Sequence, residues 1–221
     1  IIAGKKLDHS QLSLMKLMGL LLSDADTAEL EAALKPEPGL SINLLRMTNS
    51  VGAGCTEKIT SLGHAITLLG RRQLMRWLQL LLYSATPGDE HGVSPLLQLA
   101  ATRGRLMELL VDRCPEAPTG GRELIDQAYL TGILSLMPAL LGCPLALVLA
   151  ELPVAPAVQG ALDAHAGVLG DLLRLVEALE RDDTEALAAA CARRPEIDAP
   201  FANACLSRAL GWANNLAREA Q

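Results

Sequence analysis

Residues 40–70 read LSINLLRMTNSVGAGCTEKITSLGHAITLLG, and this stretch decides the fold. A leucine-rich segment ends at Asn49-Ser50, and a glycine-containing segment follows it. Apolar residues then recur at i, i+3, i+4 and i+7, at Leu62, Ala65, Ile66 and Leu69. That spacing puts them on one face of a helix, and Gly70 follows where a helix end favours a left-handed residue. The stretch therefore predicts two short helices around a turn.

The same helical spacing extends to both sides of this stretch. Asp26, with Glu29 three residues later, has the pattern of a capping box. Helices are predicted after a cap at Ser10, over residues 26–35, 40–49, 62–69 and 71–84, after Ser94-Pro95, and over residues 122–137, 144–152, 156–162, 168–180, 184–193 and 200–218. β-Branched and aromatic residues never alternate with polar ones over a useful length. The prediction is an all-α helical bundle without significant β-sheet, with residues 122–137 as its central helix.

Composition agrees with packed helices. Half of the 221 residues are apolar but only 2% are aromatic, with a single phenylalanine, so aliphatic side chains must build the core. The polar segment 86–93 contains two glycines and a proline. We expect one helical domain over residues 1–221, with a subdomain boundary in this segment that separates residues 1–85 from 94–221.

Charge and cysteine content narrow the classes of function. The net charge is −6 and basic residues are scattered, which argues against a nucleic-acid partner. Apolar runs such as residues 78–82 are far shorter than the roughly 20 residues of a membrane span, so we expect no membrane insertion. The five cysteines are widely spaced without a C-x-x-C pair, which indicates reduced thiols in the cytoplasm. The chain starts with Ile1 and shows no signal-peptide layout, so we expect a fragment of a longer protein.

Three segments of the chain carry a resemblance to a known family. Residues 44–50, 59–62 and 65–70 resemble the HDOD domain in order and spacing. The run RRQLMRW at residues 71–77 is similar to the carboxy-terminal HDOD half of bacterial proteins that begin with an EAL domain. The resemblance covers essentially the whole chain. It implies an all-α relative of HD-type phosphohydrolases that mediates protein contacts in signalling, while the EAL half binds or cleaves cyclic di-GMP. The implied partners are an EAL domain, of the same chain or of another signalling protein, or a second copy of this chain.

The resemblance also locates where a metal centre would lie. Residues 128–137 read AYLTGILSLM and resemble a family helix that reads Gly-Leu-Leu-His-Asp-Ile-Gly in many relatives, which places Ser135 and Leu136 at the two ligand positions. Hydrolysis by this class needs imidazole and carboxylate ligands for two metal ions. The sequence contains no His-Asp doublet. We therefore expect a non-catalytic interaction module with no cofactor. The alternatives are a degenerate metal-dependent phosphohydrolase and a nucleotide-binding domain.

The candidate interaction or ligand residues cluster near the Asn-Ser turn and the basic helix after it. They are Asn49, Ser50, Arg71, Arg72, Arg76, Trp77 and Arg103. Each has a plainer interpretation as well. The Asn-Ser pair is typical of local hydrogen bonds to the backbone, and the basic helix of a solvated face, although it could also bind a cyclic dinucleotide. Trp77 fits a packing role.

Two further side chains invite a functional interpretation. Arg103 interrupts an apolar stripe, so it must either pair with a carboxylate, for which Asp126 is a candidate, or open into a groove. His64 has no carboxylate near it in sequence, and we interpret it as a surface or core histidine rather than a ligand.

Overall fold

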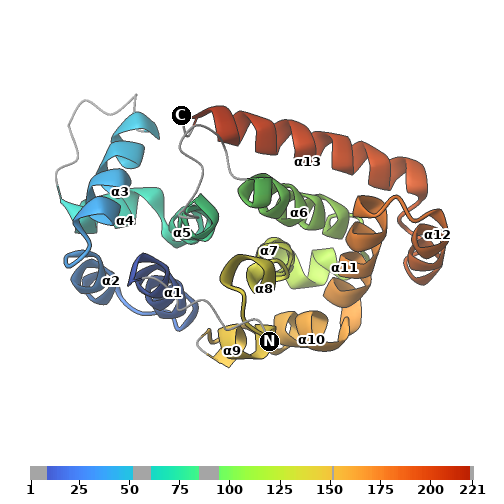
Figure 1. Cartoon of the computed structure of the whole chain (residues 1–221), viewed down its shortest axis with the longest axis horizontal. Coiled ribbons are helices and arrows are strands. Elements are labelled where there is room, and N and C mark those ends of the chain that lie inside the picture. The colour runs from blue at the N-terminus through green and yellow to red at the C-terminus, as the bar shows by residue number, and fades with distance from the viewer. Residues whose placement is uncertain (1–8, 52–60, 85–94, 151, 220–221) are drawn as a thin grey trace. The chain divides into compact units, whose positions relative to one another are not determined.

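The computed structural model describes residues 9–51, 61–84, 95–150 and 152–219, and all regular structure in these ranges is α-helix (Figure 1). The all-α prediction is confirmed. Three features of the sequence analysis lie outside the described residues: most of the turn after the Asn-Ser pair, the polar segment 86–93, and the cap at Ser94.

The chain divides into two compact units. Residues Ala150–Pro153 belong to the first, amino-terminal unit. Its helices are α1 His9–Leu22, α2 Thr27–Leu34, α3 Pro38–Val51, α4 Leu62–Leu69 and α5 Arg71–Ser84. The carboxy-terminal unit holds α6 Pro95–Val111, α7 Ala117–Leu134, α8 Met137–Leu141, most of α9 Leu145–Ala150, α10 Pro156–Ala164, α11 Gly167–Glu180, α12 Thr184–Arg193 and α13 Ala199–Glu219.

Local chemistry sets the helix ends in the amino-terminal unit. The Asp26 carboxylate accepts a hydrogen bond from the Glu29 backbone N–H at 2.8 Å, and the Glu29 carboxylate accepts one from the Asp26 N–H at 2.9 Å. The predicted capping box is therefore present. Gly70 has a φ of 78°, which glycine adopts without steric cost, so α4 ends there and α5 begins at the next residue.

Helix α6 is the most enclosed helix described in the carboxy-terminal unit. It packs against α7, α11 and α13 (Figure 1). Buried side chains cover nearly all of its circumference. Small residues such as Ala100 and Ala101 let the neighbouring helices approach. The prediction that residues 122–137 form the central helix is wrong in this respect, because the amino-terminal part of α7 is exposed at Arg122 and Glu123.

Several helix ends differ from the predicted ones by a few residues, and two of these differences have a clear local cause or consequence. Helix α7 ends at Leu134 rather than continuing to Met137, because Pro138 has no N–H to donate to the Leu134 carbonyl oxygen and lies instead in the first turn of α8. Ser135 and Leu136 form the turn between α7 and α8. At the other end of the chain Ser10 lies inside α1, which begins at His9, so Ser10 does not precede the helix as a cap.

One described segment is apolar and long enough to cross a membrane by length and composition. It is Gly121–Leu141, with a mean hydropathy of 1.4 over the window and 61% of that window buried. The sequence analysis missed this segment because Arg122, Glu123 and Asp126 gather at one end of it. A mostly buried helix in a packed core has the same composition, and this segment packs against α6, α10 and α11 through α7.

Candidate functional site at the α6–α7 crossing

Helices α6 and α7 approach each other closely where Gly104 meets Gly132. A Cβ atom on Gly132 would lie 2.8 Å from the Arg103 carbonyl oxygen and 2.8 Å from the Cα of Gly104. A Cβ atom on Gly104 would lie 3.1 Å from side-chain atoms of Ile133 and Tyr129. Glycine at residue 132 is what permits two backbones to come this close. The approach brings Arg103 next to the carboxyl end of α7.

Arg103 is 8% exposed, and protein groups bind its guanidinium on every nitrogen. Nε donates a hydrogen bond to Glu180 Oε1 at 2.9 Å, and Nη2 donates to the other carboxylate oxygen. Nη1 donates to Ser135 Oγ at 2.7 Å. The Ser135 hydroxyl in turn donates to the Gly132 carbonyl oxygen at 2.7 Å. A bidentate carboxylate and a hydroxyl thus compensate the buried charge.

The partner of Arg103 differs from the one that the sequence suggested. The carboxylate is that of Glu180, the last residue of α11, and not that of Asp126 on α7. Glu180 lies 77 residues from Arg103 in sequence, and the packing of α11 on α6 brings the two together. The expectation of a carboxylate partner was therefore correct, while its identity required the tertiary structure.

The residues at this crossing do not fit a divalent metal centre. Leu136, at the second expected ligand position, is 8% exposed and carries no lone pair for a metal. At the first position, the Ser135 hydroxyl accepts a hydrogen bond from Arg103 and donates one to the Gly132 carbonyl oxygen. The guanidinium beside them carries a permanent positive charge, which opposes a second cation at the same place.

A second buried arginine holds a cluster that includes Cys114 and Glu116, just beyond the carboxyl end of α6. Among the described residues, one group of three has the ligand types and proximity for a metal ion: Cys114, Glu116 and Glu196, whose ligand atoms lie within 4.8 Å of one another. Arg194 already binds both carboxylates there. Its Nη2 is 2.7 Å from Glu116 Oε2 and 2.5 Å from Glu196 Oε1, and its Nη1 donates to Glu116 Oε1 at 3.1 Å. A guanidinium therefore lies at the position that a metal would take.

The groups around Arg194 have shifted pKa values. The hydrogen bond from Arg194 holds the pKa of the Glu116 carboxyl below its ordinary value of 4.5. Burial raises the pKa of the Cys114 thiol to about 11, although the positive charge of Arg194 acts in the opposite direction. Cys114 is thus a protonated thiol at neutral pH, which does not suit a nucleophile.

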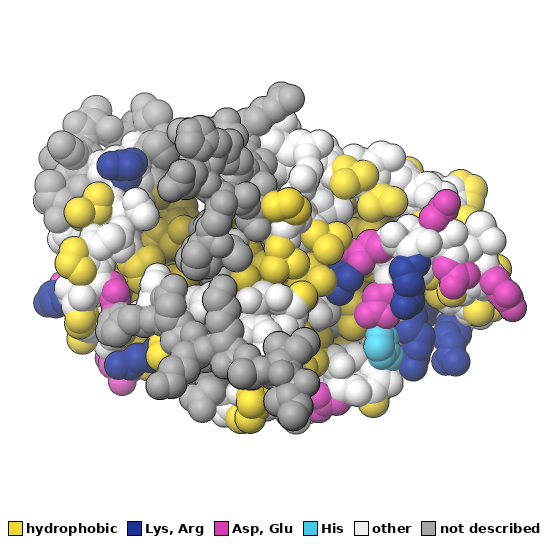
Figure 2. Space-filling view, in the orientation of Figure 1, with side chains coloured by type: hydrophobic (Ala, Val, Ile, Leu, Met, Phe, Trp, Pro, Cys, Tyr) yellow, Lys and Arg dark blue, Asp and Glu magenta, His cyan; other side chains and the backbone are white. Residues whose placement is uncertain are grey.

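Charged side chains gather over α11 and α12 (Figure 2). His165 adopts a left-handed conformation with φ 51° at the end of α10, and its Nε2 lies 3.2 Å from Glu177 Oε2. Arg174 donates to the His165 carbonyl oxygen at 2.7 Å, so it caps the carboxyl end of α10. A Cβ atom on Gly170 would lie 2.0 Å from the His165 carbonyl carbon. This cluster closes the α10–α11 turn, and we assign it a structural role.

The predicted basic residues of α5 have different surroundings in the structure. Arg71 Nη1 donates to the Ala25 carbonyl oxygen at 2.6 Å, and Arg71 Nη2 lies 3.2 Å from the Asp24 carboxylate. Arg71 thus ties the α1–α2 connection to the start of α5. Arg72 and Arg76 are half-buried, and each makes further interactions. Trp77 on the same helix is also half-buried.

The Asn-Ser pair lies in the last turn of α3. Asn49 Nδ2 donates to the Leu45 carbonyl oxygen at 2.7 Å, which is the local hydrogen bonding that the plainer interpretation predicted. The side chain of Ser50 lies outside the described residues. His64 is exposed on α4, where its backbone N–H donates to the capping Ser61 hydroxyl at 3.2 Å. Asn49, Arg71 and Arg103 thus each bind different partners, and Arg103 belongs to the carboxy-terminal unit.

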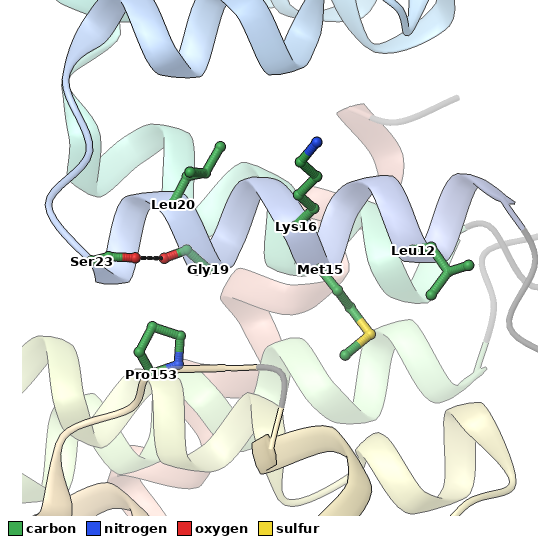
Figure 3. A pocket seen from close by; sticks show the side chains of 7 residues that line it. All are labelled: Leu12, Met15, Lys16, Gly19, Leu20, Ser23 and Pro153. Atoms are coloured by element: carbon green, nitrogen blue, oxygen red, sulfur yellow. Dashed lines mark hydrogen bonds between the residues drawn. The ribbon is translucent and has the colours of Figure 1, made fainter.

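A groove of about 310 Å³ follows one side of α1 in the amino-terminal unit (Figure 3). It is lined mainly by aliphatic side chains, at Leu12, Met15, Lys16, Gly19, Leu20, Ser23 and Pro153. Lys16 is the single titratable residue of this lining, and the Ser23 hydroxyl donates to the Gly19 carbonyl oxygen at 2.5 Å. Among these lining residues, no acid–base pair is present, and the Ser23 hydroxyl is engaged with the backbone.

Two functional side chains escaped the sequence analysis, Glu180 and Arg194. Each lies at the carboxyl end of a helix, where charged residues are common and attract no attention in the sequence. The sequence does show an arginine inside an apolar stripe, and such an arginine needs a carboxylate from another helix. This pattern is present at Arg103, but it does not say which carboxylate is the partner.

The comparisons with known proteins agree with the fold. The family model of the HDOD domain matches residues 9–144. The chain is 26% identical over 219 residues to the Uncharacterized protein YuxH of Bacillus subtilis (strain 168), which covers 98% of the chain and 51% of that protein. It is 27% identical over 168 residues to the Cyclic di-GMP phosphodiesterase CdgJ of Vibrio cholerae serotype O1, which covers 76% of the chain and 37% of that protein. The chain thus spans about half the length of the first relative and less of the second. No solved structure gives a significant match.

Proposed function

The chain belongs to the HDOD domain family, and from this premise we propose that it is a non-catalytic signal-transduction module that acts by binding a protein partner. The observation that carries the proposal is the α6–α7 crossing. Its side chains are a buried leucine, a serine engaged on both its donor and acceptor sides, and an arginine paired with Glu180. None of these groups activates water or forms a covalent intermediate in this arrangement.

The proposed partner is an EAL domain, of the same polypeptide or of another cytoplasmic signalling protein. Support comes from the family and from the Vibrio cholerae relative, whose name is that of a cyclic di-GMP phosphodiesterase. A second copy of the chain is the other partner that the resemblance implies. In either case the module would transmit a signal through contact and not through turnover.

The amino-terminal unit offers surface features for such contact. Ile42 on α3 is 56% exposed and Leu68 on α4 is 46% exposed, so both aliphatic side chains are accessible to a partner. Arg72 and Arg76 lie on α5 of the same unit, at the i, i+4 spacing of one helix face. We propose that this unit, and not the α6–α7 crossing, contacts the partner.

The first experiment measures activity and metal content together. The purified 221-residue chain is analysed for bound metal and assayed on cyclic di-GMP and on bis(p-nitrophenyl) phosphate with added Mg²⁺ or Mn²⁺. We expect no turnover above buffer. Turnover that disappears on changing Ser135 to alanine would establish the alternative, a degenerate HD-type phosphohydrolase.

The second experiment measures binding. Calorimetric titration of a purified EAL domain into the chain should give a saturable complex, and Ile42→Ser should weaken it about tenfold, as for a contact residue. The matched control is Leu210→Ser, which is also exposed but lies in the carboxy-terminal unit. Equal binding by wild type and Ile42→Ser would reject the proposed surface. Saturable binding of cyclic di-GMP alone, lost in Arg72→Ala/Arg76→Ala but kept in Arg46→Ala, would favour the nucleotide-binding alternative.

A further inference from the structure

The α6–α7 crossing gathers oxygen atoms around one positive charge, as a bound cation does. Glu180 presents both carboxylate oxygens, and Ser135 presents its hydroxyl oxygen, to the three nitrogens of Arg103. Ser135 is the residue at the carboxyl end of α7, where the helix dipole is negative. Three helices, α6, α7 and α11, thus converge on a cation that is covalently part of the chain.

We propose that Arg103 is a built-in replacement for a bound cation, which organises the α6–α7–α11 crossing without any metal. The guanidinium suits this role because its planar fork binds a carboxylate bidentately and still has a donor for the hydroxyl. The Ser135 hydroxyl in turn donates a hydrogen bond to the Gly132 carbonyl oxygen, so the hydrogen bonds run in one direction from Arg103 to the backbone of α7.

The arrangement occurs a second time in the same unit. Arg194 lies between Glu116 and Glu196, beside Cys114, where the described residues have metal-ligand types in proximity. Its side chain is 10% exposed, compared with 9% for that of Arg103. One carboxylate and one hydroxyl meet at Arg103, and two carboxylates meet at Arg194; in both places the cation that they bind is an arginine side chain.

Chemical rescue tests the proposal on the full 221-residue chain. Arg103→Ala leaves the Glu180 carboxylate without its partner, and we expect the melting temperature to fall by about 10 °C. Methylguanidinium at about 20 mM should restore at least half of this loss by binding in the vacated space. It should not restore the Arg103→Ala/Glu180→Gln variant, which has no charge to bind it.

The matched control is Arg105→Ala on the same helix, whose ion pair with Glu108 is a local i, i+3 contact. Methylguanidinium should leave its melting temperature unchanged. If Arg103→Ala does not fold, the readout becomes its refolding yield with and without methylguanidinium or Mg²⁺. Rescue of Arg103→Ala by either cation supports the proposal. Failure of both cations, or a wild-type melting temperature for Arg103→Met, overturns it.

Discussion

Two arginines, Arg103 and Arg194, are buried among the described residues, and each has carboxylate partners. A buried guanidinium without a partner would be too costly, so each arginine constrains which helix ends pack beside it. Neither pair is local in sequence: 77 residues separate Arg103 from Glu180, and 78 separate Arg194 from Glu116. At the scale of single residues, these pairs specify the packing of the carboxy-terminal unit.

Glu116 should contribute to acid sensitivity. Because Arg194 lowers its pKa below 4.5 in the folded chain, the unfolded chain binds this proton more tightly. The stabilisation is present above pH 4.5 and is lost as the pH falls through the lower folded value. Glu116→Gln should flatten the loss of stability below about pH 4.5, by less than about 1 kcal/mol because the side chain is 44% exposed. Urea unfolding between about pH 3 and 7 checks this. Glu185→Gln is the control and should keep the pH profile of the wild type. If Glu116→Gln keeps that profile as well, the prediction is wrong.

The cysteines should differ in reactivity. Burial raises the pKa of Cys114 to about 11 and also raises the pKa of Cys205 above its ordinary value. Both thiols are buried, whereas Cys143 is half-buried. Iodoacetamide at about pH 8 should therefore alkylate Cys143 before Cys114 and Cys205, because the thiolate is the reacting species. Peptide mass spectrometry over time measures the order. Modification of Cys114 as fast as Cys143 would show that the cluster around Arg194 opens in solution.

At the scale of helices, the crossing of α6 and α7 depends on glycine, whereas the helix ends depend on caps. The ends of α2 and α4 follow from local patterns, the capping box at Asp26 and the left-handed Gly70. The close approach at Gly132 has no local signal, because an isolated glycine inside a helical pattern reads simply as a weak helix former. The need for glycine at residue 132 becomes clear only when α6 is packed against α7.

Gly132→Ala should destabilise the chain by about 2 kcal/mol or more, because the new methyl group would meet the backbone of α6, which cannot rotate away. The matched control is Gly211→Ala on α13, where a Cβ atom would meet nothing within 4 Å. That change should be neutral or stabilising by up to about 1 kcal/mol. Chemical denaturation of both variants tests the pair. Equal stability of the two would show that α6 and α7 are farther apart than described.

At the scale of the whole molecule, the chain holds two compact units with cores of their own. Leu17 and Leu30 are buried in the amino-terminal unit, and Leu106 and Leu175 in the carboxy-terminal unit. The family model ends at residue 144, yet α11 and α13, beyond that point, pack directly on α6. The carboxy-terminal helices are therefore part of the folded unit to which α6 belongs.

The two tryptophans report on the two units separately, since Trp77 lies on α5 and Trp212 on α13. In a Trp77→Phe background the fluorescence follows the carboxy-terminal unit, and in a Trp212→Phe background it follows the amino-terminal unit. Leu175→Ala should lower the free energy of unfolding reported by Trp212 by about 2–5 kcal/mol. Leu17→Ala should lower the free energy reported by Trp77 by a similar amount. A substitution that moves both midpoints equally would show one cooperative core.

The sequence by itself determined the helical class, most helix boundaries and the absence of a His-Asp doublet, because hydrophobic period, caps and glycine stops act within one or two turns. It also determined that Arg103 needs a carboxylate. Only the tertiary structure decided that this carboxylate is Glu180, that α7 ends at Leu134 and that α6 is the enclosed helix. The physical reason is that apolar faces attract one another without specifying a partner, so pairs about 77 residues apart are set by packing and not by any local pattern.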